Sequence, residues 1–193
     1  ETKEFLFDIL TEVIGLFPGP YIHIGGDEVR FNNWTAHSLD QSLMNSLGFT
    51  NGTATANLQK YQSYFTQQIA NWINSQGKIM IGWSEIMNGG LVTNAVLMDW
   101  LATKATFTAT NGQYVVMSPS ATAYINKWET ANNSSGSGVI WSNEPPAQSG
   151  LVTLSTAYNF EPVPAGLSST YTNYILGSQG NSWTEWISSL QNM

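Results

Sequence analysis

The stretch Tyr21–Glu28, YIHIGGDE, decides how the fold of this chain is interpreted. A short apolar run that is typical of a strand ends in two glycines, which are followed by two adjacent carboxylates, Asp27 and Glu28. Glycine weakens a strand, and neighbouring like charges repel each other. Because the sequence accepts both costs at one position, we expect a functional site directly after this strand.

The segments on either side of this strand predict helices. Apolar residues recur at helical spacing over residues 5–16, and Pro18-Gly19-Pro20 ends the predicted helix. A polar loop is expected over residues 32–55. An amphipathic helix follows from Leu58 to Trp72, and Gly77 closes it.

Further apolar runs predict the rest of a sheet. They are KIMIGW (78–83), AVLMDW (95–100), YVVMS (114–118) and YILGSQGNSW (174–183), with a helix starting in WTEWISSL (183–190). These runs are mostly apolar throughout rather than alternating, which is typical of parallel strands that are buried on both faces. Helical segments between them predict βα units and therefore an α/β fold.

Polar or aromatic residues gather at the carboxyl ends of the predicted strands. In a (β/α)8 barrel these ends all open onto one face, where the active site lies. We therefore expect the following residues to converge although they are far apart in the sequence: Asp27, Glu28, Trp83, Glu85, Asp99, Trp100, Tyr124, Trp183 and Glu185.

Composition limits the function classes. The net charge is -7 with only six Lys and Arg residues, which argues against nucleic acid and anionic membranes as partners and favours a neutral substrate. There is no cysteine, no apolar run long enough to span a membrane and no metal-binding spacing, so we expect no cofactor and no metal. The richness in Asn, Thr, Ser, Gln and Gly favours an extracellular or cell-surface location.

The paired carboxylates and the tryptophans indicate carbohydrate chemistry. Two carboxylates in one site shift each other's pKa, which provides a general acid beside an anion. A solvated, idle Asp-Glu pair is the alternative, but the position after HIGG favours a site. Trp72 is best explained by core packing, whereas Trp83, Trp100 and Trp183 lie at strand ends, where core packing and stacking on sugar rings are both open. Glu185 is suited to a contact with a sugar hydroxyl.

His23 lies inside the predicted strand, where a hydrogen-bonded structural role is favoured over a catalytic one. We retain it as a candidate substrate-binding residue.

HIGGDEV (23–29) resembles the signature of the family 20 glycoside hydrolases, the β-N-acetylhexosaminidases. The resemblance continues in chain order and covers nearly the whole sequence. It includes IMIGWSEI (79–86), VLMDW (96–100), VVMSPSATAYIN (115–126), FEPVP (160–164) and ILGSQGNSWTEW (175–186).

This resemblance implies a retaining, substrate-assisted mechanism, in which the acetamide oxygen of an N-acetylhexosamine attacks its own anomeric carbon. Glu28 would be the general acid and base, Asp27 would hold the acetamide N–H, and Tyr124 would donate to the acetamide oxygen. The implied substrate-binding residues are His23, Trp83, Trp100, Asn126, Trp183 and Glu185.

The chain departs from the family pattern in two ways. Members commonly have Tyr-x-Asp where this chain has Tyr124-Ile125-Asn126, and Asn126 can bind a hydroxyl but carries no charge. A (β/α)8 barrel takes about 250 residues, and the arginine that the family's first strand supplies cannot be assigned, since the sole arginine is Arg30. We therefore expect residues 1–193 to form the C-terminal part of one catalytic TIM barrel, about strands 4–8, without its N-terminal half.

Three other interpretations stay open at this point. Within the same class, a lacto-N-biosidase would release a disaccharide, because loop lengths decide what lies beyond the first sugar. A carbohydrate-binding remnant without turnover would have no need of the proton donor that the Asp27-Glu28 pair provides. A purely structural βα scaffold would not explain the polar residues at the strand ends.

Overall fold

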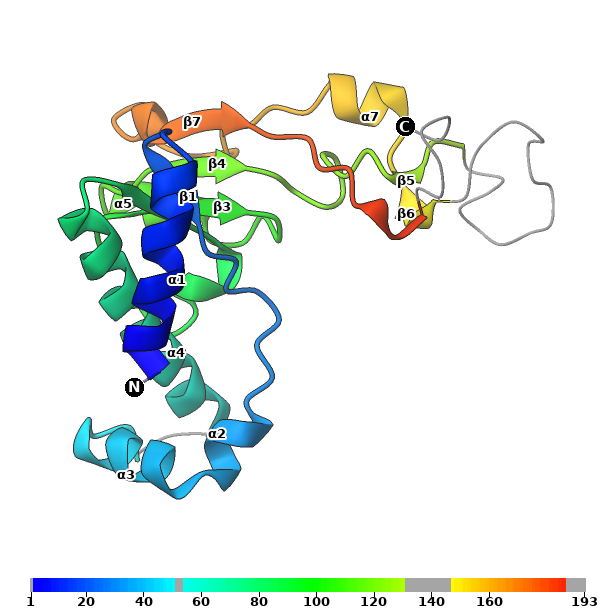
Figure 1. Ribbon diagram of the computed structural model, residues 1–193. Helices are drawn as coiled ribbons and strands as arrows, with labels where there is room; N and C mark the ends of the chain where they lie inside the picture. The colour runs from blue at the N-terminus through cyan, green and yellow to red at the C-terminus, as the bar shows by residue number, and fades with distance from the viewer. Residues whose placement is uncertain (1, 51–53, 131–146, 187–193) are drawn as a thin grey trace.

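The computed structural model describes residues 2–50, 54–130 and 147–186, and its centre is a five-stranded parallel sheet (Figure 1). The strand order is β1-β2-β3-β4-β7, so each strand pairs with the next main-sheet strand in the sequence. The strands are β1 (Tyr21–His23), β2 (Ile79–Trp83), β3 (Ala95–Asp99), β4 (Val115–Met117) and β7 (Ile175–Ser178). The predicted α/β fold with a parallel sheet is confirmed.

The helices and the remaining short elements lie around this sheet. The α-helices are α1 (Thr2–Leu16), α2 (Asn32–Ala36), α3 (Ser38–Ser46), α4 (Ala54–Ser75), α5 (Ala105–Thr110) and α7 (Leu154–Tyr158). Short 3-10 helices are η1 (Ser84–Met87), η2 (Thr172–Tyr174) and η3 (Thr184–Trp186), and a small second sheet joins β5 (Lys127–Trp128) to β6 (Gln148–Leu151). Among the described residues, no helix is long and apolar enough to cross a membrane.

One face of the sheet is covered by helices. Ile22, Met80 and Ala95 are register partners on three neighbouring strands, and all of them belong to the main hydrophobic core. Side chains of α1, α4 and α5 pack into the same core. Trp72 of α4 stacks on Phe7 of α1 with ring centroids 4.7 Å apart, so its predicted role in core packing is confirmed.

The opposite face of the sheet lines a hollow of about 500 Å³. Side chains alternate along a strand, so the register row that starts at His23 and Ile81 points away from the helices. His23, Ile81, Trp83 and Met98 line this hollow together with the loop that follows β7. Among the described residues, the helices that pack into the main core, α1, α4 and α5, therefore lie on the face of the sheet opposite this hollow.

The segment predicted as a polar loop over residues 32–55 instead contains α2 and α3. Short helices gain little from local propensity, so their stability comes from packing that a sequence pattern does not display. Here Met44 of α3 packs with Leu58 and Tyr61 of α4 in a second hydrophobic cluster, which also includes Trp34 of α2. The Tyr61 hydroxyl donates to Asp40 Oδ1 over 2.7 Å and ties α4 to α3.

Two further predictions, for the connection after β2 and for the length of the last strand, need correction. The connection from β2 to β3 covers residues 84–94 and contains the four-residue 3-10 helix η1 rather than an α-helix. The helix expected to start in residues 183–190 begins with the 3-10 turn Thr184–Trp186, and its continuation stays a prediction because residues 187–190 lie outside the described part of the chain. The strand predicted over 174–183 is shorter, Ile175–Ser178. Beyond the carboxyl ends of the strands, β5, β6 and α7 project from the main sheet (Figure 1).

Candidate active site

Seven of the predicted site residues meet in a pocket of about 190 Å³ at the carboxyl ends of the sheet. The expectation of convergence is met for residues that are far apart in the sequence. The lining residues are Asp27, Glu28, Trp83, Trp100, Tyr124, Gln148, Trp183 and Glu185. All of them except Gln148 were candidates from the sequence.

The loop that carries the carboxylates is tied to the neighbouring strand and to its own histidine. The Trp83 backbone N–H donates to Gly25 O over 2.9 Å, and the Gly25 N–H donates to His23 Nδ1 over 3.0 Å. Gly26 has φ +94°, and a Cβ added there would lie 2.6 Å from Cγ2 of Ile86. The glycine is required because both the backbone angle and the close packing exclude a side chain.

Asp27 and Glu28 follow this turn and are exposed at the mouth of the pocket. Glu28 has φ +48°, which places a non-glycine residue in the left-handed region. Such conformations are unfavourable and persist only where the surroundings hold them, and they cluster at functional sites. The backbone therefore turns the two neighbouring carboxylates into one pocket.

Four aromatic rings form the wall of the pocket in a continuous chain. Trp83 and Trp183 have ring centroids 5.9 Å apart, and Trp183 and Tyr124 are also 5.9 Å apart at an interplanar angle of 61°. Tyr124 then stacks with Trp100 at 6.3 Å. The flat rings leave apolar faces beside the carboxylates, which suits a ligand with both apolar CH faces and polar groups.

Trp100 is held from two sides by residues at the end of β2. Its indole Nε1–H donates to Glu85 Oε2 over 2.9 Å, and its backbone N–H donates to Ser84 Oγ over 3.1 Å. The Ser84 hydroxyl donates to Asp99 Oδ1 over 2.7 Å. Asp99 is fully buried, and its Oδ2 accepts the N–H groups of Lys104 and Ala105. It stabilises the start of α5 and does not line the pocket, contrary to its expected place among the converging residues.

Tyr124 is a buried phenol at the centre of the aromatic wall. Burial raises its pKa, and the negative charges of Asp27 and Glu85 act in the same direction, while hydrogen bonds from Trp183 and Asn181 oppose them. The phenol is therefore protonated at neutral pH and can donate a hydrogen bond. A parallel β-bridge to Asn181 fixes the backbone of this tyrosine.

Comparisons with known proteins agree with this geometry. The family sequence model described as "Glycosyl hydrolase family 20, catalytic domain" matches residues 1–193. The chain belongs to glycosyl hydrolase family 20.

Named relatives of this family 20 chain are β-hexosaminidases. One from Porphyromonas gingivalis is 35% identical over 185 residues, covering 95% of this chain and 22% of that protein. One from Vibrio furnissii is 30% identical over 195 residues, covering 100% of this chain and 30% of that protein. The chain thus spans less than a third of the length of these relatives.

A solved family 20 structure shares the fold. It is the exo-β-N-acetylglucosaminidase of Vibrio harveyi in complex with N-acetylglucosamine. Its TM-score against this chain is 0.73 at 31% sequence identity, and the match covers 97% of this chain and 28% of that one.

The family 20 chain places Asn126 behind the pocket rather than in its lining. Asn126 is 8% exposed, and its Nδ2 donates over 3.2 Å to Oε1 of Gln148, which does line the pocket. Lys127 lies over the Tyr124 ring, with Nζ 5.6 Å from the centroid. Gln148 was missed because it belongs to a short polar strand, and nothing in the sequence around it indicates a site.

His23 lies beside the family 20 pocket, in the hollow on the same side of the sheet. Its ring meets Trp83 edge-on at 4.9 Å, and its Nδ1 accepts the Gly25 N–H, so the neutral ring carries its proton on Nε2. Burial lowers the pKa of His23, and the charge of Asp27 partly opposes this. The structure gives His23 a positioning contact with the carboxylate loop and no place in the pocket lining.

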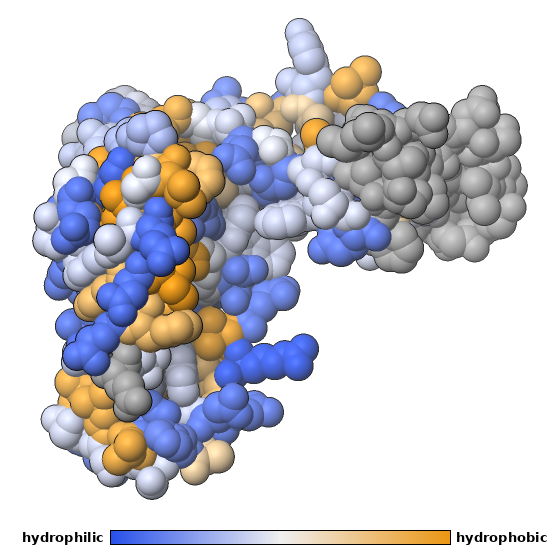
Figure 2. Space-filling view, in the orientation of Figure 1, coloured by the Kyte–Doolittle hydropathy of each residue, from blue (hydrophilic) through white to orange (hydrophobic). Residues whose placement is uncertain are grey.

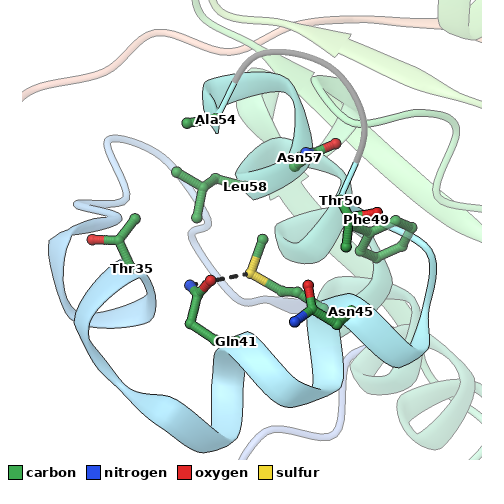
Figure 3. Close-up of a pocket in the computed structure, with 9 residues that line it drawn as sticks. Thr35, Gln41, Asn45, Phe49, Thr50, Ala54, Asn57 and Leu58 are labelled. Carbon is green, nitrogen blue, oxygen red and sulfur yellow. Dashed lines mark hydrogen bonds between the residues drawn. The ribbon is translucent and has the colours of Figure 1, made fainter.

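A second pocket, of about 340 Å³, lies between α2, α3 and α4 (Figure 3). Figure 3 shows Gln41, Asn45 and Asn57 around it, and no residue of its lining is titratable. It therefore offers no acid or base, and none of the predicted site residues lines it. Over the described ranges, no group of three or more His, Cys, Asp or Glu side chains is arranged to hold a metal ion.

Proposed function

We propose that this chain forms part of the catalytic domain of a β-N-acetylhexosaminidase. The enzyme removes terminal β-linked GlcNAc or GalNAc from glycans by retaining, substrate-assisted hydrolysis. The observation that carries the proposal is the position of Asp27 and Glu28 in one pocket with the aromatic wall of Trp83, Trp183 and Tyr124. Membership of family 20 and the likeness to an enzyme solved with N-acetylglucosamine support it.

The proposed reaction begins with protonation by Glu28. Its carboxyl proton passes to the glycosidic oxygen while the bond from C1 to the leaving group breaks, and the substrate's acetamide oxygen forms a bond to C1. The product of this step is a cyclic oxazolinium ion. In the second step Glu28, now ionised, takes a proton from a water molecule that attacks C1 and reopens the ring. Two displacements at C1 leave the sugar with its original β configuration.

Asp27 and Tyr124 act on the acetamide group in this proposal. Asp27 accepts the acetamide N–H, which orients the oxygen toward C1 and stabilises the positive charge that develops on the ring. The protonated Tyr124 phenol, whose pKa burial raises, donates to the acetamide oxygen. The two adjacent carboxylates thus have different tasks, which accounts for the cost of placing them side by side.

The remaining pocket residues bind the sugar. Trp83, Trp100 and Trp183 stack on its CH faces, and Glu185 accepts hydrogen bonds from its hydroxyl groups. Asn126 acts on the outer hydroxyls through Gln148, whose side-chain oxygen it fixes. His23 supports the loop below the sugar, because it accepts the Gly25 N–H.

We also propose that these residues are about strands 4–8 of a TIM barrel whose N-terminal half is a further part of the same catalytic domain. Three observations support this: helices cover one face of the sheet, β1 is an edge strand, and α1 exposes Phe5 and Leu16. Figure 2 shows apolar surface alongside the polar stripe of α1. An extracellular or cell-surface location stays a proposal that rests on composition.

Substrate assistance is tested with two aryl β-glycosides that differ only in the acetamide, an N-acetylglucosaminide and the matched glucoside. We expect turnover of the first only, with the β anomer as the first product detected by NMR. Equal cleavage of the glucoside, or initial release of the α anomer, would overturn the mechanism. Binding of N-acetylglucosamine with no turnover would favour a carbohydrate-binding remnant instead.

A further inference from the structure

Gln62 of α4 reaches the loop that carries the carboxylate pair. It is 4% exposed, and its Nε2 donates to Gly26 O over 2.7 Å, across 36 residues of sequence. Burial of an amide is costly unless its hydrogen bonds are made, whereas an apolar side chain would fill the same space without that cost. The position of this donor is therefore better explained by what it holds than by helix packing.

The loop turns through three residues with positive φ, and this conformation is unfavourable for the one that is not glycine, Glu28. Gly25 has φ +74°, Gly26 has φ +94° and Glu28 has φ +48°. The carbonyl of Gly26 belongs to the peptide group that joins it to Asp27. Because a peptide group is planar, fixing this oxygen fixes the plane from which the chain enters Asp27 and Glu28.

The residue after Gln62 strengthens the same contact. The Ser63 hydroxyl donates to Ile86 O over 3.1 Å and accepts the Gly89 N–H over 3.2 Å. Ile86 is the residue whose Cγ2 packs against Gly26. One turn of α4 therefore holds the carboxylate loop directly through Gln62. It also supports the loop indirectly, because Ser63 bonds the backbone of Ile86, which packs against Gly26.

We infer that Gln62 is a positioning residue for the general acid: its hydrogen bond to Gly26 sets the direction in which Asp27 and Glu28 project into the pocket. This inference rests on the proposed function and deepens it. The effect of losing the bond must then depend on how much protonation the leaving group needs, because Glu28 supplies that proton.

The test is the Gln62→Met variant of the full-length natural protein. Methionine keeps the size of the side chain and removes the hydrogen-bond donor. A substrate with a poor leaving group, the β-linked N-acetylglucosamine disaccharide, should lose about 10- to 100-fold in kcat/KM, the scale of a small misplacement of a catalytic group. An aryl substrate with a good leaving group should lose much less.

Gln67→Met is the matched control on the same helix. Gln67 also bonds a loop backbone, because its Nε2 donates to Thr93 O over 3.2 Å and its Oε1 accepts the Thr93 N–H over 2.8 Å. Thr93 precedes β3, at the end of the sheet away from the pocket. Loss of this contact should change stability without changing the ratio of the two activities.

The outcomes separate the inference from the proposed function. Equal losses on both substrates in Gln62→Met, as fewer folded molecules would give, would overturn the positioning role, as would the same selectivity change in Gln67→Met. No turnover by the unsubstituted protein would overturn the proposed function and the inference together. Turnover with a selective loss in Gln62→Met and none in Gln67→Met would support both.

Discussion

The indole N–H of Trp100 donates to the carboxylate of Glu85 over 2.9 Å. The two residues follow neighbouring strands, β3 and β2, and Trp100 lines the pocket while Glu85 does not. The orientation of the Trp100 ring in the aromatic wall therefore depends on Glu85, which lies behind the wall and does not line the pocket.

Glu85→Leu should weaken substrate binding, because the Trp100 N–H loses its acceptor and the ring loses its orientation. We expect KM to rise about fivefold, which corresponds to about 1 kcal/mol for one lost hydrogen bond. Glu85→Gln keeps an acceptor oxygen and is the control, with KM near the wild-type value. Steady-state kinetics on an aryl N-acetylglucosaminide measures both, and an unchanged KM in the leucine variant would contradict the role of Glu85.

Asp27→Asn should remove most activity on N-acetyl sugars. The amide has lost the charge that stabilises the developing cation, and the removal of such an electrostatic contact costs about 100- to 1000-fold in kcat. The fall should appear in kcat rather than in binding of N-acetylglucosamine, measured by calorimetry. A variant with near wild-type kcat would argue against the proposed task of Asp27.

Gly26→Ala should destabilise the protein and the site. The new Cβ would lie 2.6 Å from Ile86 Cγ2 at φ +94°, and a left-handed non-glycine residue costs about 1–2 kcal/mol before any clash is counted. Gly15→Ala is the control, because Gly15 lies in α1 with nothing within 4 Å of an added Cβ. Alanine there should stabilise the helix by up to about 1 kcal/mol.

Urea unfolding followed by tryptophan fluorescence measures both alanine variants. Equal stability of the Gly26 and Gly15 variants would contradict the packing described for the carboxylate loop.

Stability should fall as the pH drops below about 6.5, the ordinary pKa of histidine. The folded state lowers the pKa of His23, chiefly through burial, so the unfolded chain binds a proton at a pH where the folded protein does not. Each decrease in pH within this window therefore lowers the free energy of unfolding. This decrease in stability ends once the pH is below the pKa of His23 in the folded state.

His23→Asn isolates this contribution, because an asparagine oxygen can replace the Nδ1 acceptor but does not titrate. Denaturant unfolding at a series of pH values should show a shallower dependence in the variant. Identical pH dependence in the two proteins would show that His23 is not the group responsible.

The sequence predicted the sheet and the position of the site because each main-sheet strand is a short apolar run with a polar or aromatic residue just beyond it. Parallel strands place those residues at one edge whatever their separation in sequence, which is why Asp27 and Trp183 could be placed together. Trp72 was assigned to the core from its helical spacing alone.

Other features could not be predicted because they depend on contacts between distant segments. The helices α2 and α3 are stabilised by Tyr61 and Leu58 of α4, which the polar sequence over residues 32–55 does not show. Gln148 lines the pocket in place of the predicted Asn126, and Asn126 lies behind it and donates a hydrogen bond to its side chain. Gln62 has the pattern of any polar residue on a helix until its partner, Gly26 O, is known.

The most direct measurement is hydrolysis of the β-linked N-acetylglucosamine disaccharide, an unactivated glycoside, by the protein and by its Glu28→Gln variant. We predict turnover by the first, and in the second a loss of turnover on unactivated glycosides while N-acetylglucosamine still binds, because glutamine keeps the shape but has no proton to donate. Wild-type rates in Glu28→Gln would contradict the central claim that Glu28 is the general acid and base of this family 20 site.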